Sequence, residues 1–158
     1  MATGTIKWFS AGLLQLGMKV HNLTSDVLKM GIVTTATVPT TDTAIPHWGG
    51  TGTTNFAANQ VSTGGGYTGP ITLSSVTFTE IGSSPKIPTL RATDPVIPQN
   101  ASGFTNGAYG IIYNDTDANK RALGFIELDA GGALNIVTGS KTIDFQGAGT
   151  DILTLTPA

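Results

Sequence analysis

The residues of this chain whose types and spacing come closest to doing chemistry lie in the segment Asp115-Thr-Asp-Ala-Asn119. Asp, Asp and Asn stand at alternate positions, an arrangement that can direct oxygen atoms at a Ca²⁺ ion. An EF-hand loop would continue with Gly and close with Glu, but Lys120 and Ile126 occupy those positions. Lys120 and the arginine after it would also repel a cation. We therefore predict a hairpin loop capped by Asp and Asn side chains, with no metal and no other cofactor.

Other residue types that carry chemistry occur without the spacing that chemistry needs. The glycine-rich stretches 49–52 and 64–66 resemble phosphate-binding loops, but neither is followed by Lys-Ser/Thr. His21 and His47 are far apart in sequence, and no Ser or Cys stands in a recognisable nucleophile motif. We interpret both histidines as structural or surface residues. The sequence predicts no catalytic residues, and we expect a protein that is not an enzyme.

Composition excludes further classes of function. Only 11% of the 158 residues are charged, where about 25% is typical of soluble domains. The formal net charge of -2, with only 8 Lys and Arg residues, argues against nucleic acid as a partner. No stretch approaches the roughly 18 consecutive apolar residues of a membrane helix. The first residues do not resemble a secretory signal, so we expect synthesis in a cytoplasm without export by that route.

The element that we expect to position the Asp/Asn loop is a β-hairpin over residues 106–128. Two apolar runs rich in Ile, Tyr and Phe flank the polar loop, as in a pair of antiparallel strands. Tyr109, Ile111 and Tyr113 share one face, yet Ile112 on the other face is also apolar. Both faces of this pair are therefore expected to be covered, which makes the hairpin central to a sheet.

An N-terminal helix is expected over residues 6–18. Ile6, Phe9, Leu13 and Leu16 recur at helical spacing, which indicates one buried stripe. Leu14 and Trp8 fall outside this stripe and would be exposed or would contact a partner.

The remaining segments predict further strands and one long irregular arm. The arm covers residues 37–69, and we expect a short helical turn in it at Phe56. Strands are expected over 27–35, 71–79, 86–92, 134–137, 141–145 and 151–156, with 86–92 at a sheet edge because Pro88 interrupts it. Residues 1–158 are thus expected to form a single mainly β domain. Its predicted architecture is a jelly-roll-like β-sandwich of about seven to nine strands with one short N-terminal helix.

Four segments, taken in order, resemble a family of small structural proteins of tailed bacteriophages. The helix leads into LTSDVLKMGIVTT (23–35), which is followed by VSTGGGYTGPITLSSVTFTE (61–80). An aromatic-rich hairpin lies within LRATDPVIPQNASGFTNGAYGIIYNDTDANKRALGFIELD (90–129), and TIDFQGAGTDILTLT (142–156) closes the pattern. The resemblance implies a component of the virion, and it does not separate capsid from tail.

Three functions follow from this resemblance and from the composition. The first is a capsid cement or decoration protein that bridges major capsid subunits or other virion proteins, as a homo-oligomer on the particle. The second is a tail, adaptor or fibre-base component. The third is an enzyme or a carbohydrate-binding module of the virion in which Trp48 and Tyr67 stack on sugars. Trp48 and Phe56 have no evident place in the predicted sandwich, so interface residues are expected at Trp8, Trp48, Phe56 and Tyr67.

Overall fold

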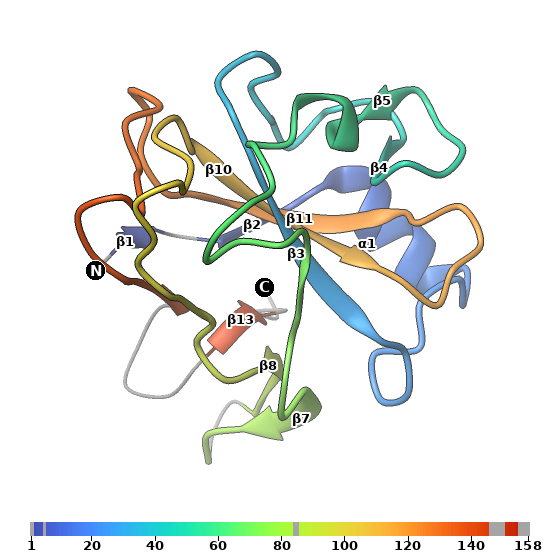
Figure 1. Ribbon diagram of the computed structural model, residues 1–158. Coiled ribbons are helices and arrows are strands. Elements are labelled where there is room, and N and C mark those ends of the chain that lie inside the picture. Colours follow the sequence, from blue (N-terminus) through green and yellow to red (C-terminus); the bar gives the residue numbers. More distant parts are fainter. Residues whose placement is uncertain (1, 5, 84–85, 146–150, 155–158) are drawn as a thin grey trace.

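The computed structural model describes residues 2–4, 6–83, 86–145 and 151–154. These residues form a mainly β fold with one α-helix near the N-terminus, which confirms the predicted class (Figure 1). The elements are β1 (Ala2–Gly4), β2 (Ile6–Trp8), α1 (Ser10–Gly17), β3 (Leu28–Val33), β4 (Pro46–His47), β5 (Thr54–Asn55), the 3-10 helix η1 (Phe56–Asn59), β6 (Ile71–Thr72), β7 (Thr77–Ile81), β8 (Ile87–Arg91), β9 (Val96–Ile97), β10 (Tyr109–Asn114), β11 (Ala122–Glu127), β12 (Lys141–Phe145) and β13 (Asp151–Thr154).

The centre of the molecule is a five-stranded sheet in the order β2-β11-β10-β3-β6. Strands β10 and β11 pair as an antiparallel hairpin in which Ile111 lies opposite Phe125. Strand β3 pairs with the other edge of β10, where Ile111 lies opposite Gly31. The predicted central hairpin is therefore confirmed, with neighbouring strands on both sides.

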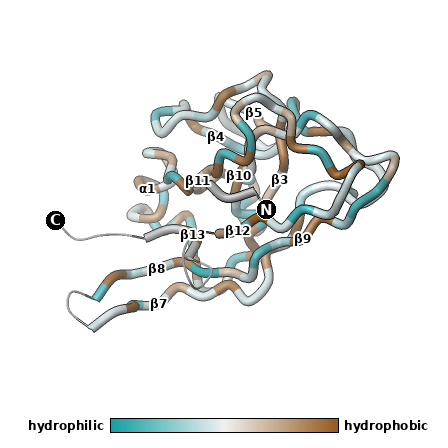
Figure 2. The backbone as a smooth tube through the Cα atoms, turned by 90° about the vertical axis from the view of Figure 1, so that its left-hand side faces the viewer, coloured by the Kyte–Doolittle hydropathy of each residue, from teal (hydrophilic) through white to brown (hydrophobic). Residues whose placement is uncertain are grey.

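Each face of this sheet has its own core, as the unbroken apolar pattern of β10 predicted. Because side chains of a strand alternate between faces, Ile112 belongs to the hydrophobic cluster on one face, which we call the first core, and Ile111 belongs to the cluster on the other face, the second core. On the Ile112 face, the sheet packs against residues of the smaller sheets β13-β8-β7 and β1-β12-β9, including Leu90 and Ile143. These layers form the sandwich, and Figure 2 shows the β7–β8 hairpin projecting at its lower left.

The opposite face is covered by the part of the arm that contains Trp48 and Phe56 and by the start of α1, whereas Tyr67 near the end of the arm packs on the Ile112 face. Phe9 and Phe56 are fully buried there, and their rings lie 5.8 Å apart. The Phe9 ring also lies 5.1 Å from that of Phe125 on β11. The turn predicted at Phe56 is confirmed as η1, whose backbone is capped by the Asn55 side chain. The arm is thus a layer of the protein's own core, drawn at the top right of Figure 1 with β4 and β5.

Helix α1 begins four residues later than expected because the preceding segment forms a strand. Ile6 and Trp8 pair with β11, so residues 6–8 extend the central sheet before the chain turns into the helix. Gly12 then lies directly against β11. A Cβ at this position would be 2.6 Å from the Leu123 carbonyl oxygen, which explains why glycine is found within a helix here.

Strand β8 does not lie at a sheet edge as Pro88 suggested, because β13 and β7 flank it. The pairing is nevertheless compatible with the missing backbone N–H of Pro88. Strand β7 pairs along all of β8, including Pro88, whereas β13 pairs with β8 only from Arg91 to Thr89. The strand as a whole is central, and the proline sits where, in the described part of the chain, only one neighbour pairs with it.

Two other strand predictions were wrong in extent. The segment 71–79 divides into β6, which pairs with β3, and β7, which pairs with β8. Ser75 between them has a positive φ of 53°, so the chain turns from one sheet to the other there. Residues 134–137 do not form a strand, and their β-pairing is limited to an isolated bridge from Leu134 to Gly107. The last predicted strand is β13, and its positions 155 and 156 lie outside the described residues.

Candidate functional site

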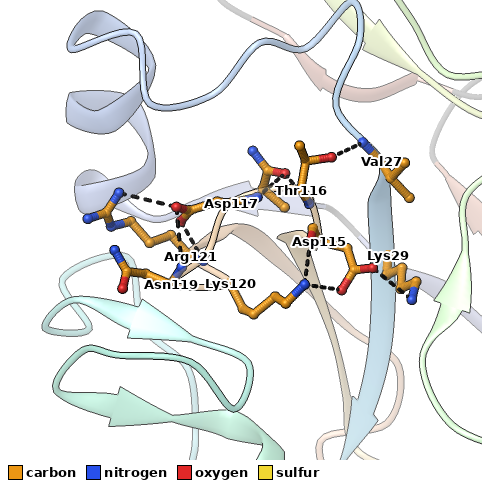
Figure 3. Close-up of polar contacts among 9 residues, drawn as sticks. Val27, Lys29, Asp115, Thr116, Asp117, Asn119, Lys120 and Arg121 are labelled. Carbon is orange, nitrogen blue, oxygen red and sulfur yellow. Dashed lines mark hydrogen bonds and ion pairs between the residues drawn. The ribbon is translucent and has the colours of Figure 1, made fainter.

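The Asp/Asn loop between β10 and β11 is a tightly bonded turn, shown in Figure 3. The Asn114 side-chain oxygen accepts hydrogen bonds from the backbone N–H groups of Thr116 and Asp117. The Asp117 carboxylate in turn accepts from the backbone N–H groups of Asn119 and Arg121. These contacts confirm the predicted loop capped by Asp and Asn side chains.

The carboxylates of this turn are also matched by cations of the protein itself. The Asp115 carboxylate lies 2.8 Å from the Lys29 amine of β3 and 2.9 Å from the Lys120 amine. Partial burial raises the pKa of Asp115, but the hydrogen bonds from Lys29 and Lys120 outweigh burial and lower that pKa below its ordinary value. The turn is thereby fixed to β3, and the Asp115 oxygens that a Ca²⁺ site would use accept from two lysines.

A buried polar cluster joins this turn to the segment after α1. The Asn114 Nδ2 donates to the His21 Nδ1 at 3.1 Å and to the Asp26 carboxylate at 2.6 Å. Since His21 Nδ1 accepts, its proton is on Nε2, which lies 3.2 Å from the Gln15 Oε1 of α1. His21 therefore bridges α1 to β10 in its neutral form, and burial lowers its pKa.

This arrangement predicts that stability falls in mild acid. A His21 pKa below that of the unfolded chain, about 6.5, means that the unfolded state binds more protons as pH drops from about 7 to 5. Burial lowers the pKa of His47 as well, so both residues act in the same direction. Urea unfolding should give a smaller free energy near pH 5 than near pH 7.5, and the difference should shrink in His21→Gln. Equal stability at both pH values in the wild type would contradict this account.

The four residues predicted at an interface are largely enclosed by the protein's own chain. Trp48 and Phe56 lie in the second core, where Trp48 stacks on Tyr113 with ring centroids 5.5 Å apart. Tyr67 is buried in the first core. Its hydroxyl accepts from the Ile32 backbone N–H, and burial raises its pKa to about 12. Trp8 is half-buried, with its indole nitrogen covered.

The expectation that Trp48 and Phe56 stand outside the sandwich is therefore wrong. The physical reason is that the arm folds back over the sheet and places Trp48 and Phe56 on the apolar face that β10 and β11 leave open. Burial also leaves Trp48 and Tyr67 without an exposed ring on which a sugar could stack. The carbohydrate-binding hypothesis thus loses the two residues on which it depended.

Gly31 of β3 shows how closely Trp48 fits. A Cβ on Gly31 would lie 2.1 Å from the nearest atom of the Trp48 ring. We expect Gly31→Ala to cost about 1–3 kcal/mol through overpacking, measured by urea unfolding. Gly17→Ala is the matched control, since a Cβ there meets nothing within 4 Å and alanine favours helix. A Gly31→Ala protein as stable as the wild type would mean that the Trp48 ring does not occupy this site.

A group of exposed apolar side chains lies along α1. Leu14 and Met18 are each 65% exposed, and Leu13 and Ile45 are exposed beside them. We call these four residues the α1 patch. Beside the patch, Leu14, Met18 and Ile45 line a groove of about 280 Å³. Sequence spacing anticipated Leu14 as an exposed or partner-facing residue, but it placed Leu13 in the buried stripe and gave no signal for Ile45.

A second depression of about 370 Å³ lies on the other side of the helix. Leu16, Leu23 and Phe78 contribute apolar side chains to it, and His21 lies at its wall. Both ring nitrogens of His21 already have partners, so this depression offers no free polar group from that residue.

Among the described residues, no group of three or more His, Cys, Asp or Glu side chains is arranged to hold a metal ion. None of the described helices has the length and apolar character needed to cross a membrane. Comparisons of the chain with protein-family models, with curated proteins and with solved structures found no match.

Proposed function

We propose that this protein is a non-enzymatic structural component of a tailed-bacteriophage virion, and specifically a capsid cement protein that bridges major capsid subunits. The sequence resemblance supports the assignment to a virion, and the surface of the arm supports a role in permanent contacts with other subunits.

The observation that carries the proposal is the near absence of charge over a long stretch of sequence. Between Lys29 and Glu80 the sole charged residue is Asp42. Much of this stretch is nevertheless at the surface, with exposed side chains at Val38, Thr40, Thr41, Thr51 and Thr53. Cores of protein interfaces are depleted of charged residues in the same way, whereas free protein surfaces are rich in them.

The fold gives this surface a rigid support. The arm is anchored from beneath by Trp48 and Phe56 in the second core, so its outer face is held against the central sheet. Its backbone is also tied to the body, since Trp48 N–H donates to the Lys120 carbonyl and Ser10 N–H donates to the Thr41 carbonyl. A preorganised surface loses little conformational entropy when it binds a neighbouring subunit.

Addition of the purified protein to capsids that lack it tests the proposal. We expect saturable binding at many copies per capsid, measured by co-sedimentation. A Val38→Lys, Thr51→Lys variant should fold normally but bind at least about tenfold more weakly, because it places charge in the contact. Val96→Lys, which changes an exposed residue of β9, should bind like the wild type. Wild-type protein that does not bind capsids but binds isolated tails would replace the cement role by the tail role.

A further inference from the structure

Strand β7 is the longest strand at a sheet edge within the described ranges. It forms the outer strand of the sheet β13-β8-β7 and is five residues long. The strands at the other sheet edges, which are β1, β2, β4, β5, β6, β9 and β13, are two to four residues long. Short edge strands are one way in which proteins prevent pairing with another chain. Strand β7 lacks this protection, so its edge is better suited than the others to bind an additional strand.

Other features that protect edge strands are also missing from β7. The strand contains no proline, and its pairing with β8 is regular from Thr77 to Ile81, without a bulge. Its one charged residue is Glu80, whose carboxylate lies 3.6 Å from the Lys86 amine of the same hairpin. In Figures 1 and 2, β7 is the outermost strand at the lower end of the molecule, and no other described strand pairs with its free side. A second chain can therefore reach this edge.

Pro88 of β8 determines which backbone groups of β7 are free. Glu80 lies opposite Pro88, which has no N–H, so these two residues form a pair without hydrogen bonds between them. Such pairs alternate with hydrogen-bonded pairs in an antiparallel ladder, so Thr79 and Ile81 bond to β8. The N–H and C=O groups of Phe78 and Glu80 then point away from β8. They present a row of donors and acceptors with which an added strand can pair.

The side chains of β7 indicate that this added strand is β7 of a second copy. If two β7 strands pair antiparallel about a two-fold axis at Thr79, all five residues have a partner. Thr79 then lies opposite Thr79 of the second copy, Thr77 opposite Ile81, and Phe78 opposite Glu80. Thr–Thr pairs are favourable across strands, and no like charges lie opposite each other in this register. An axis at Glu80 would instead place two carboxylates face to face.

We infer that two copies of this chain associate by antiparallel pairing of their β7 strands, which joins their outer sheets into one continuous sheet. The contact uses the same surface on both copies, as a closed dimer requires. It lies outside the arm of residues 37–69, which we assign to the capsid contact. It also concerns the purified chain alone, so either proposal can fail while the other stands.

A single introduced cysteine tests this register, because the chain has no cysteine of its own. Opposite residues of a pair without hydrogen bonds have Cα atoms about 4.5 Å apart, within the range that a disulfide spans. Under mild oxidation, Thr79→Cys should form a disulfide-linked dimer at least about tenfold faster than Thr77→Cys, as measured on non-reducing gels. Thr77→Cys is the matched control, since Thr77 is equally exposed on the same side of β7. Its two cysteines would be separated by four residues of strand, about 14 Å.

Sedimentation velocity over a concentration series measures the association without a crosslink. The wild type should form a dimer that dissociates on dilution. Thr79→Lys and Thr79→Glu should each raise the dissociation constant by about tenfold or more, because like charges then lie directly opposite each other. An equimolar mixture of the two variants should recover the dimer, because opposite charges then meet. Both variants should keep the near-UV circular dichroism of the wild type, since Thr79 is exposed.

Three results would overturn the inference. A wild type that remains monomeric at every concentration would leave the β7 edge to a strand of a different protein. Equal crosslinking of Thr79→Cys and Thr77→Cys would mean that the copies meet through another surface or in another register. A mixture of Thr79→Lys and Thr79→Glu that associates no better than either variant alone would exclude a two-fold axis at Thr79.

Discussion

A Trp48→Ala, Phe56→Ala double variant is expected to be largely unfolded at room temperature. Trp48 stacks on Tyr113, and Phe56 is fully buried against Phe9. Truncation of a buried Phe or Trp to Ala costs about 3–5 kcal/mol, and the two substitutions together cost about 6–10 kcal/mol if they act independently. That loss is comparable to the whole stability of a domain, about 5–15 kcal/mol.

Far-UV and near-UV circular dichroism of the double variant, with urea unfolding of each single variant, measures this effect. Val38→Ala, Thr51→Ala is the matched control, because it changes two exposed residues of the same arm. Its stability should stay within about 0.5 kcal/mol of the wild type. A double variant that folds with nearly wild-type stability would show that the arm is an appendage and not a layer of the core.

Phe125→Ala is expected to cost about 3–5 kcal/mol by opening a cavity between the central sheet and the layer above it. Phe125 is 5% exposed, lies opposite Ile111 in the hairpin, and contacts the Phe9 ring. The Phe125 side chain thereby links strand β11 of the hairpin to Phe9 at the start of α1. The measurement is the free energy of unfolding in urea.

Glu127→Ala on the same strand is the control for this substitution, since Glu127 is exposed. It should change the free energy of unfolding by no more than about 0.5 kcal/mol. If Phe125→Ala lost less than about 1 kcal/mol, β11 would not lie in the core as described.

The parts of the fold that sequence predicted well are those in which periodicity and turn residues agree. Strands β10 and β11 have apolar runs on both sides of a polar loop, and Ile111, Ile112, Phe125 and Ile126 are all buried, as a hairpin covered on both faces requires. The loop itself was predictable because Asp and Asn side chains cap neighbouring backbone N–H groups, which is a local interaction. Local signals of this kind do not depend on the rest of the chain.

The arm could not be placed in the same way because its contacts are long-range. Trp48 and Phe56 stand in a segment rich in Gly, Thr and Pro, where no periodic pattern assigns a buried face. Their place is decided by the open face of the central sheet. Strand β3 of that sheet precedes the arm, and β10 and β11 lie more than fifty residues after Phe56. Such burial is a property of the assembled sheet and leaves no signature in the arm's own sequence.

The N-terminal segment shows a competition between local and tertiary preferences. The spacing of Ile6, Phe9, Leu13 and Leu16 fits a helix, yet pairing with β11 draws residues 6–8 into the sheet. The helix that remains is rotated so that Gly12 faces β11, and Leu13 is left 40% exposed. The helical period was correctly recognised, but the side that faces the core was set by close packing on the Leu123 backbone.

The number of copies of this protein per particle tests the proposed cement role most directly. Quantitative mass spectrometry of purified virions, with the major capsid protein as the internal standard, gives that number. The cement role predicts hundreds of copies, in a fixed ratio to the major capsid protein. Tens of copies or fewer would assign the protein to the tail, and its absence from purified particles would contradict the virion role altogether.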